Sequence, residues 1–255
     1  MKKYIIILLV SGLFCGKLYA QENPKNKGLK EPQPQITLPT SRADVPETNR
    51  KAKIRAETKL IDAGDNQYII TDGWEMIAAD KIPATGKKIS LNMNTRRWYN
   101  ATVPGTVLTT LVEQGVYPDP LWGLNNMHIP DTLCRTDWWY RTSFSVPEEK
   151  TKGKTYLLFN GINYEAHIWL NGKFLGKMKG AFIRGKFDIS SLLEKTNYLA
   201  VKIVPPPHPG IPHEQSGLSP KGHNGGVLVK DGPTFFCTEG WDWLPGIRDR
   251  NIGIW

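Results

Sequence analysis

The strongest constraint on the fold is a succession of short runs of alternating or continuous apolar residues, punctuated by Gly, Pro, Asp and Asn. Such runs occur at residues 67–70, 74–77, 89–91, 98–103, 139–146, 155–159, 165–170 and 198–204. Alternation with a period of two places one set of side chains on each face of a strand, so these runs predict β-strands. Many short strands at close spacing bury their apolar faces best against a second sheet. The sequence therefore predicts an all-β sandwich of the jelly-roll type.

Two local signals add detail to this sandwich. The dipeptide Asn171-Gly172 is typical of a type I′ hairpin turn, because both residues tolerate positive φ. One short helix is predicted at residues 106–114, where apolar residues follow helical spacing, Thr106 or Thr109 can cap the start and Gly115 closes the end.

The first 20 residues are typical of a secretory signal peptide. Two lysines precede an apolar run from Tyr4 to Phe14, and the small Ala20 precedes Gln21. We expect cleavage after Ala20 and a secreted or periplasmic product. Cys15 raises the alternative of a lipoprotein anchor, but the bulky Phe14 stands where such signals carry a small residue. No other run approaches the roughly 20 apolar residues of a membrane helix, so no transmembrane segment is predicted.

Residues 21–60 are predicted to be a disordered, basic, Pro-rich linker, and residues 61–255 a single jelly-roll domain. The net charge of +9 falls to +6 once the three signal-peptide lysines leave. The linker holds nine Lys and Arg against five Asp and Glu, so the domain keeps only about +2. Because the basic excess lies in a tail, the charge predicts a solvated tether and no nucleic-acid partner.

The residues of chemically active types form no familiar catalytic or metal-binding pattern. Cys134 and Cys237 can pair in an oxidising compartment or remain apart as buried thiols, and the sequence leaves both open. No Cys and His spacing suits zinc, no glycine pattern cradles a phosphate, and no Ser-His-Asp order occurs. We therefore predict no metal and no cofactor. Glu165 is expected to be solvated on its strand, and Asp249 to pair with its neighbours Arg248 and Arg250.

The most informative candidate site is Trp241-Asp242-Trp243, a carboxylate between two indoles. Indole rings can cover the C–H faces of a sugar while the carboxylate accepts hydrogen bonds from its hydroxyls. In the alternative interpretation both indoles belong to the core and Asp242 caps a turn. Asn125 has two similar interpretations, as a turn asparagine that bonds local backbone or as an amide that reaches sugar hydroxyls.

Several motifs in one order resemble the N-terminal jelly-roll (galactose-binding-like) domain of glycoside hydrolase family 2. They are Pro104-Gly105-Thr106, Asp119-Pro120-Leu121-Trp122-Gly123-Leu124-Asn125, Trp138-Trp139-Tyr140-Arg141, Phe159-Asn160-Gly161-Ile162, Ile168-Trp169-Leu170-Asn171-Gly172 and Gly240-Trp241-Asp242-Trp243. The last motif and residues 247–255 are most similar to the β-mannosidase, endo-β-mannosidase and exo-β-glucosaminidase branch. The resemblance implies that Asp242 and Trp241 face the sugar where its bond is cut, that Asn125 contacts sugar hydroxyls, and that Trp243 packs.

The same resemblance implies that the catalytic glutamates belong to a (β/α)8 barrel C-terminal to this domain. We therefore assign no catalytic residue in this chain, and its end at Ile252–Trp255 is interpreted as a strand cut in mid-run. The full-length protein is predicted to be a secreted retaining exo-β-glycosidase that acts on a β-linked oligosaccharide or glycoside. The barrel would be the partner of this domain, and the chain alone is expected to be inactive. The alternative is a stand-alone carbohydrate-binding module without catalysis.

Overall fold

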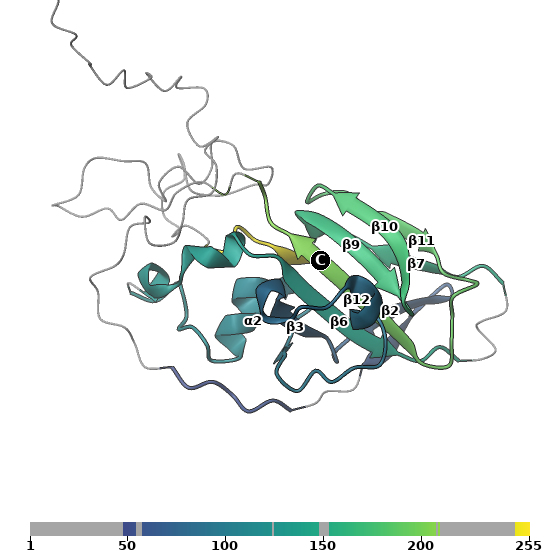
Figure 1. Cartoon of the computed structure of the whole chain (residues 1–255), viewed down its shortest axis with the longest axis horizontal. Helices are drawn as coiled ribbons and strands as arrows, with labels where there is room; N and C mark the ends of the chain where they lie inside the picture. Colours follow the sequence, from purple (N-terminus) through teal and green to yellow (C-terminus); the bar gives the residue numbers. More distant parts are fainter. Residues whose placement is uncertain (1–47, 55–57, 124, 148–152, 208, 210–247) are drawn as a thin grey trace, which may run out of the picture.

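The computed structural model describes residues 48–54, 58–123, 125–147, 153–207, 209 and 248–255, which form a layered β-structure (Figure 1). The main sheet has six antiparallel strands in the order β10, β9, β12, β6, β3, β4. Their bounds are β3 Glu75–Ala78, β4 Tyr99–Asn100, β6 Trp138–Phe144, β9 Glu165–Leu170, β10 Lys173–Lys179 and β12 Asn197–Val204.

Three smaller sheets and short helices complete the fold. The sheets are β1 (Lys59–Gly64) with β2 (Gln67–Thr71), β7 (Tyr156–Phe159) with β11 (Gly185–Asp188), and β13 (Gly253–Ile254) between β5 (Gly105–Thr106) and β8 (Ile162–Asn163). The α-helices are α1 (Gly86–Ile89) and α2 (Val107–Glu113), and the 3-10 helices are η3 (Ala79–Lys81), η4 (Asn125–His128) and η5 (Asp131–Cys134). None of the helices in the described ranges is long and apolar enough to cross a membrane.

Both faces of the main sheet are covered, because its strands send alternate residues to two separate cores. Tyr140, Ile168 and Val201 belong to the larger core, which also takes apolar side chains from α2, β7, β8 and β13. Their neighbours along the strands face the opposite side of the sheet: Trp139 and Ala200 join a smaller core with Ile89 of α1. The predicted alternation therefore produces the all-β sandwich that the sequence indicates.

The two local predictions are confirmed. Asn171 and Gly172 have φ of 48° and 78°, and they join β9 to β10 where Leu170 pairs with Lys173. The Thr106 hydroxyl accepts a hydrogen bond from the Thr109 backbone N–H (3.1 Å) and so caps α2.

One predicted strand is wrong, because residues 89–91 do not extend as a strand. Ile89 is the last residue of α1, and its side chain is fully buried in the smaller core. The Thr85 side chain caps the start of this helix by accepting from the Lys88 N–H. The short apolar run therefore packs one helical face, a case that periodicity cannot distinguish from a buried strand.

Residues 48–54, within the predicted linker, contact the sandwich. The Arg50 guanidinium lies 4.3 Å from the centroid of the Tyr99 ring, and the Lys51 N–H donates to the Gln114 carbonyl (2.9 Å). The Asn100 side-chain amide donates to the Ile54 carbonyl (2.6 Å). This segment therefore follows the edge of the domain from α2 toward β3.

Candidate functional site

A buried ionic cluster joins two segments that are far apart in the sequence. The 3-10 helix η5 presents Asp131, and the turn before β13 presents Arg250; their side chains are 1% and 0% exposed. Arg250 Nη2 lies 2.7 Å from Asp131 Oδ1, and Arg135 Nε lies 2.9 Å from Asp131 Oδ2. One carboxylate thus receives two guanidinium groups, an arrangement that offsets much of the cost of burying charge. We call Asp131, Arg135 and Arg250 the platform.

Arg250 also holds two points of the backbone that flank the predicted sugar-binding motif. Its Nε donates to the Pro209 carbonyl (2.5 Å), and its Nη1 donates to the Arg248 carbonyl (3.2 Å). Trp241 and Asp242 lie between these points, outside the described residues. The platform therefore brings together the two ends of the stretch that carries both of them.

The backbone after Arg250 is fixed by β8. The Asn163 side-chain amide donates to the carbonyls of Arg250 (3.0 Å) and Asn251 (2.9 Å). Two residues later, Gly253 pairs with Asn163 on one side and with Thr106 on the other. The platform is thus attached to a strand that is hydrogen-bonded along both edges.

Asp249 stabilises the start of α2. Its carboxylate is buried and accepts from the backbone N–H groups of Leu108 (2.5 Å) and Asn251 (3.0 Å). Burial raises the pKa of Asp249, although these hydrogen bonds oppose the rise. Its hydrogen bond to Leu108 satisfies a helix N–H that has no partner within the helix, so the residue has a structural role.

Cys134 is a buried thiol beside the platform. Its Sγ donates to the Asp131 carbonyl (3.1 Å), and burial raises its pKa to about 12. A thiol with so high a pKa is a poor nucleophile at neutral pH. Cys237 lies outside the described residues, so the pairing of the two cysteines stays open.

Asn125 lies at the start of η4, six residues before Asp131. Its side-chain amide donates to the Asp119 carbonyl (2.9 Å), and its backbone N–H donates to the Trp122 carbonyl (3.1 Å). Asn125 therefore makes the local turn contacts that one interpretation predicts, and its role toward sugar stays a prediction. The side chain of Trp122, in the same segment, is 76% exposed.

Glu165 has more partners than expected. His167 Nε2 lies 2.8 Å from its Oε1, and Lys179 Nζ lies 3.7 Å from its Oε2. The hydrogen bond with His167 is the main cause that holds the pKa of Glu165 below its usual value. Within the described ranges, no group of three His, Cys, Asp or Glu side chains is placed to hold a metal ion.

The domain that carries this site is similar to known proteins. A family described as "Glycosyl hydrolase 2 galactose-binding domain-like" matches residues 74–255. The mannosylglycoprotein endo-beta-mannosidase of Lilium longiflorum is 36% identical over 201 residues, which cover 74% of this chain and 20% of that protein. An exo-beta-D-glucosaminidase of Streptomyces avermitilis is 30% identical over 190 residues, covering 72% of this chain and 17% of the relative.

A solved structure agrees with the sequence relatives. The exo-chitosanase CsxA of Amycolatopsis orientalis superposes with a TM-score of 0.50 at 25% identity, over 61% of this chain and 17% of that one. The chain thus spans about a fifth of the length of the curated relatives it matches.

Proposed function

Because this chain belongs to glycoside hydrolase family 2, whose galactose-binding-like N-terminal domain it forms, we propose that it supplies one wall of the sugar pocket in a secreted, retaining exo-β-glycosidase. The observation that carries the proposal is Arg250, which holds both backbone flanks of the Trp241-Asp242 stretch against Asp131. A rigid base of this kind is what a sugar-binding loop needs to keep its side chains in place.

Chain connectivity supports a common location for the three predicted contacts. Asp242 precedes Arg248 by six residues, and Asn125 precedes Asp131 by six residues. Six residues span at most about 20 Å when fully extended. This connection allows Asp242 and Asn125 to contact one sugar beside the platform.

The chemistry divides between this domain and the rest of the polypeptide. Trp241 would cover the apolar face of the sugar, while Asp242 and the Asn125 side-chain oxygen would accept hydrogen bonds from its hydroxyls. Retaining glycosidases need two carboxyl groups about 5 to 5.5 Å apart. The buried carboxylates described above, Asp131 and Asp249, are engaged by guanidinium and backbone N–H groups. The resemblance to glycoside hydrolase family 2 assigns the catalytic pair to a barrel C-terminal to this domain.

The test is Asp242→Ala in the polypeptide that continues through the barrel. An acceptor whose hydrogen bonds strengthen in the transition state should contribute about 2 to 4 kcal/mol, so kcat/KM should fall roughly 30- to 1000-fold while Tm stays unchanged. A turn-capping aspartate would instead cost about 1 kcal/mol of stability and leave the kinetics of the folded enzyme normal. Asp80→Ala, at an exposed position, is the matched control. A destabilised but fully active Asp242→Ala enzyme would contradict the proposal.

A further inference from the structure

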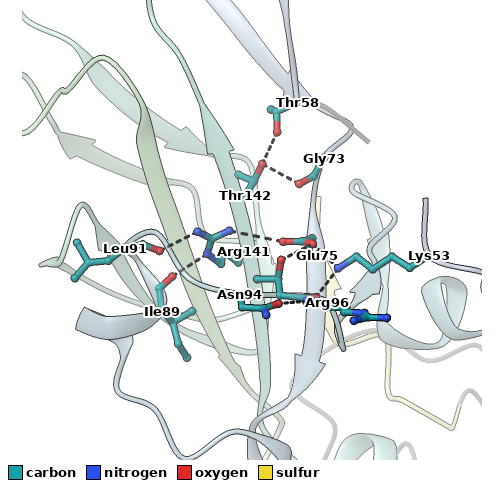
Figure 2. Close-up of polar contacts among 11 residues, drawn as sticks. Lys53, Thr58, Gly73, Glu75, Ile89, Leu91, Asn94, Arg96, Arg141 and Thr142 are labelled. Carbon is teal, nitrogen blue, oxygen red and sulfur yellow. Dashed lines mark hydrogen bonds and ion pairs between the residues drawn. The ribbon is translucent and has the colours of Figure 1, made fainter. Parts of the chain in front are cut away.

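Two cavities, of about 600 and 590 Å³, flank one ion pair on the main sheet. Glu75 of β3 and Arg141 of β6 line both cavities, and Figure 2 shows the pair with its neighbours. We call the two cavities and this pair the Glu75–Arg141 basin. Each half lies within the range of volumes typical of small-ligand sites.

The charges at the floor of the basin are paired with one another. Arg141 Nη1 lies 3.7 Å from Glu75 Oε2, and the other Arg141 donors bond the carbonyls of Ile89 and Leu91 (both 2.9 Å) (Figure 2). Lys53 Nζ contacts Glu75 and donates to the Thr95 carbonyl (2.6 Å). Both cations near the carboxylate therefore have partners.

The walls of the basin are rich in neutral hydrogen-bonding groups. Ser143, Ser145 and Thr196 line the first cavity, and Asn92 lines the second; among the described residues none of these four side chains makes a hydrogen bond. The Tyr198 ring lies 5.0 Å from the Arg141 guanidinium and borders the second cavity. Hydroxyls and amides beside an aromatic ring suit a polyhydroxylated, uncharged ligand.

The basin is separate from the platform. Strand β6 begins at Trp138, whose indole N–H donates to the Leu133 carbonyl of η5 (3.0 Å), and ends at Phe144, which lines the first cavity. The seven residues of this strand span about 20 Å from the first Cα to the last. A single sugar residue held at one end would therefore not reach the other.

We propose that the Glu75–Arg141 basin is a second carbohydrate-binding site, for a neutral β-linked oligosaccharide. The Glu75 carboxylate, held in place by Lys53 and Arg141, lines both halves and can accept hydroxyl hydrogen bonds, while the walls supply further donors and acceptors. Residues 48–54 complete one wall through Lys53. The site would hold a polysaccharide chain at a distance from the sugar that the platform loop contacts.

The test is isothermal titration of the purified chain with β-1,4-linked mannohexaose and, separately, cellohexaose. Ser145→Trp should fill the first cavity from its exposed rim and weaken binding at least tenfold. Asn92→Ala removes a side-chain amide from the second cavity and should weaken binding severalfold. Phe182→Ala removes an aromatic side chain that is 81% exposed and is not among the basin's lining residues, so this control should bind as the unchanged chain does. Melting curves establish that all variants are folded.

Two outcomes would overturn the proposal. One is that neither hexasaccharide binds the unchanged chain, or that an acidic oligosaccharide such as trigalacturonate binds in preference. The other is that Ser145→Trp and Asn92→Ala bind as tightly as the unchanged chain. Asp242→Ala should leave intact the binding that Ser145→Trp and Asn92→Ala weaken, so failure of the basin and failure of the proposed role of Asp242 are distinguishable.

Discussion

Replacing Asp131 by alanine should destabilise the domain more than an ordinary surface substitution can. The Asp131 carboxylate is 1% exposed and receives Arg250 at 2.7 Å and Arg135 at 2.9 Å, and the side chains of these two arginines are 0% and 8% exposed. Removing it takes away the carboxylate that both buried guanidinium groups contact. Breaking a buried pair in this way typically costs about 3 to 5 kcal/mol, a large part of the 5 to 15 kcal/mol that stabilises most domains.

Urea denaturation of the purified chain measures this cost. With an m-value of about 2 kcal/mol/M, the expected loss lowers the unfolding midpoint by about 1.5 to 2.5 M. Asp80→Ala is the matched control, because Asp80 pairs with Lys81 at 3.4 Å while its side chain is 58% exposed. Exposed pairs contribute little, so the control should change the free energy of unfolding by less than about 0.5 kcal/mol.

A double-mutant cycle with Arg250→Met tests the reason for the effect. If the two side chains act as one unit, the second substitution should cost less in the presence of the first, with a coupling energy of about 0.5 to 3 kcal/mol. Two results would refute a stabilising role for this ion pair in the platform. One is that the losses in unfolding free energy of the two single variants simply add in the double variant. The other is that Asp131→Ala has the same unfolding midpoint as Asp80→Ala.

Two further substitutions test particular contacts. Glu165→Gln should flatten the acid limb of a plot of Tm against pH. His167 holds the carboxyl pKa of Glu165 low in the folded state, so the ionised carboxylate stabilises the fold at pH values above its unfolded pKa of about 4.3. This stability is lost as the pH falls through the lower folded pKa. An unchanged acid limb would argue against this contact. Gly253→Ala should cost about 1 to 3 kcal/mol in urea denaturation, because its Cβ would lie 2.1 Å from the Gly105 carbonyl oxygen and force β5 from β13. A loss below about 0.5 kcal/mol would show that the strands separate easily.

Local features were the ones that the sequence predicted well. The Asn171-Gly172 turn and the Thr106 cap each depend on residues within four positions of one another, so residue type alone indicates them. Helix α1 was missed because a short apolar run has the pattern of a buried strand as well as of a buried helical face. The partner at its end is also distant, since Arg141, more than 50 residues away, donates to the carbonyl of Ile89. No local pattern reveals such a partner.

The platform was missed for the same physical reason. Asp131 and Arg250 are 119 residues apart, and their contact depends on the packing of η5 against the turn before β13. The only sequence signal was the charged run Arg248-Asp249-Arg250 beside the Trp-rich motif. The exposure of Trp122 is visible only in the folded chain.

The most direct test of the account is a hydrolysis assay on the purified chain, with p-nitrophenyl β-mannoside and p-nitrophenyl β-glucosaminide as reporters. We predict no release of p-nitrophenol above the uncatalysed rate, because the domain is proposed to bind sugar while both catalytic carboxylates belong to the barrel. Turnover that survives further purification and disappears when a carboxylate of this chain is replaced by its amide would contradict that division of roles.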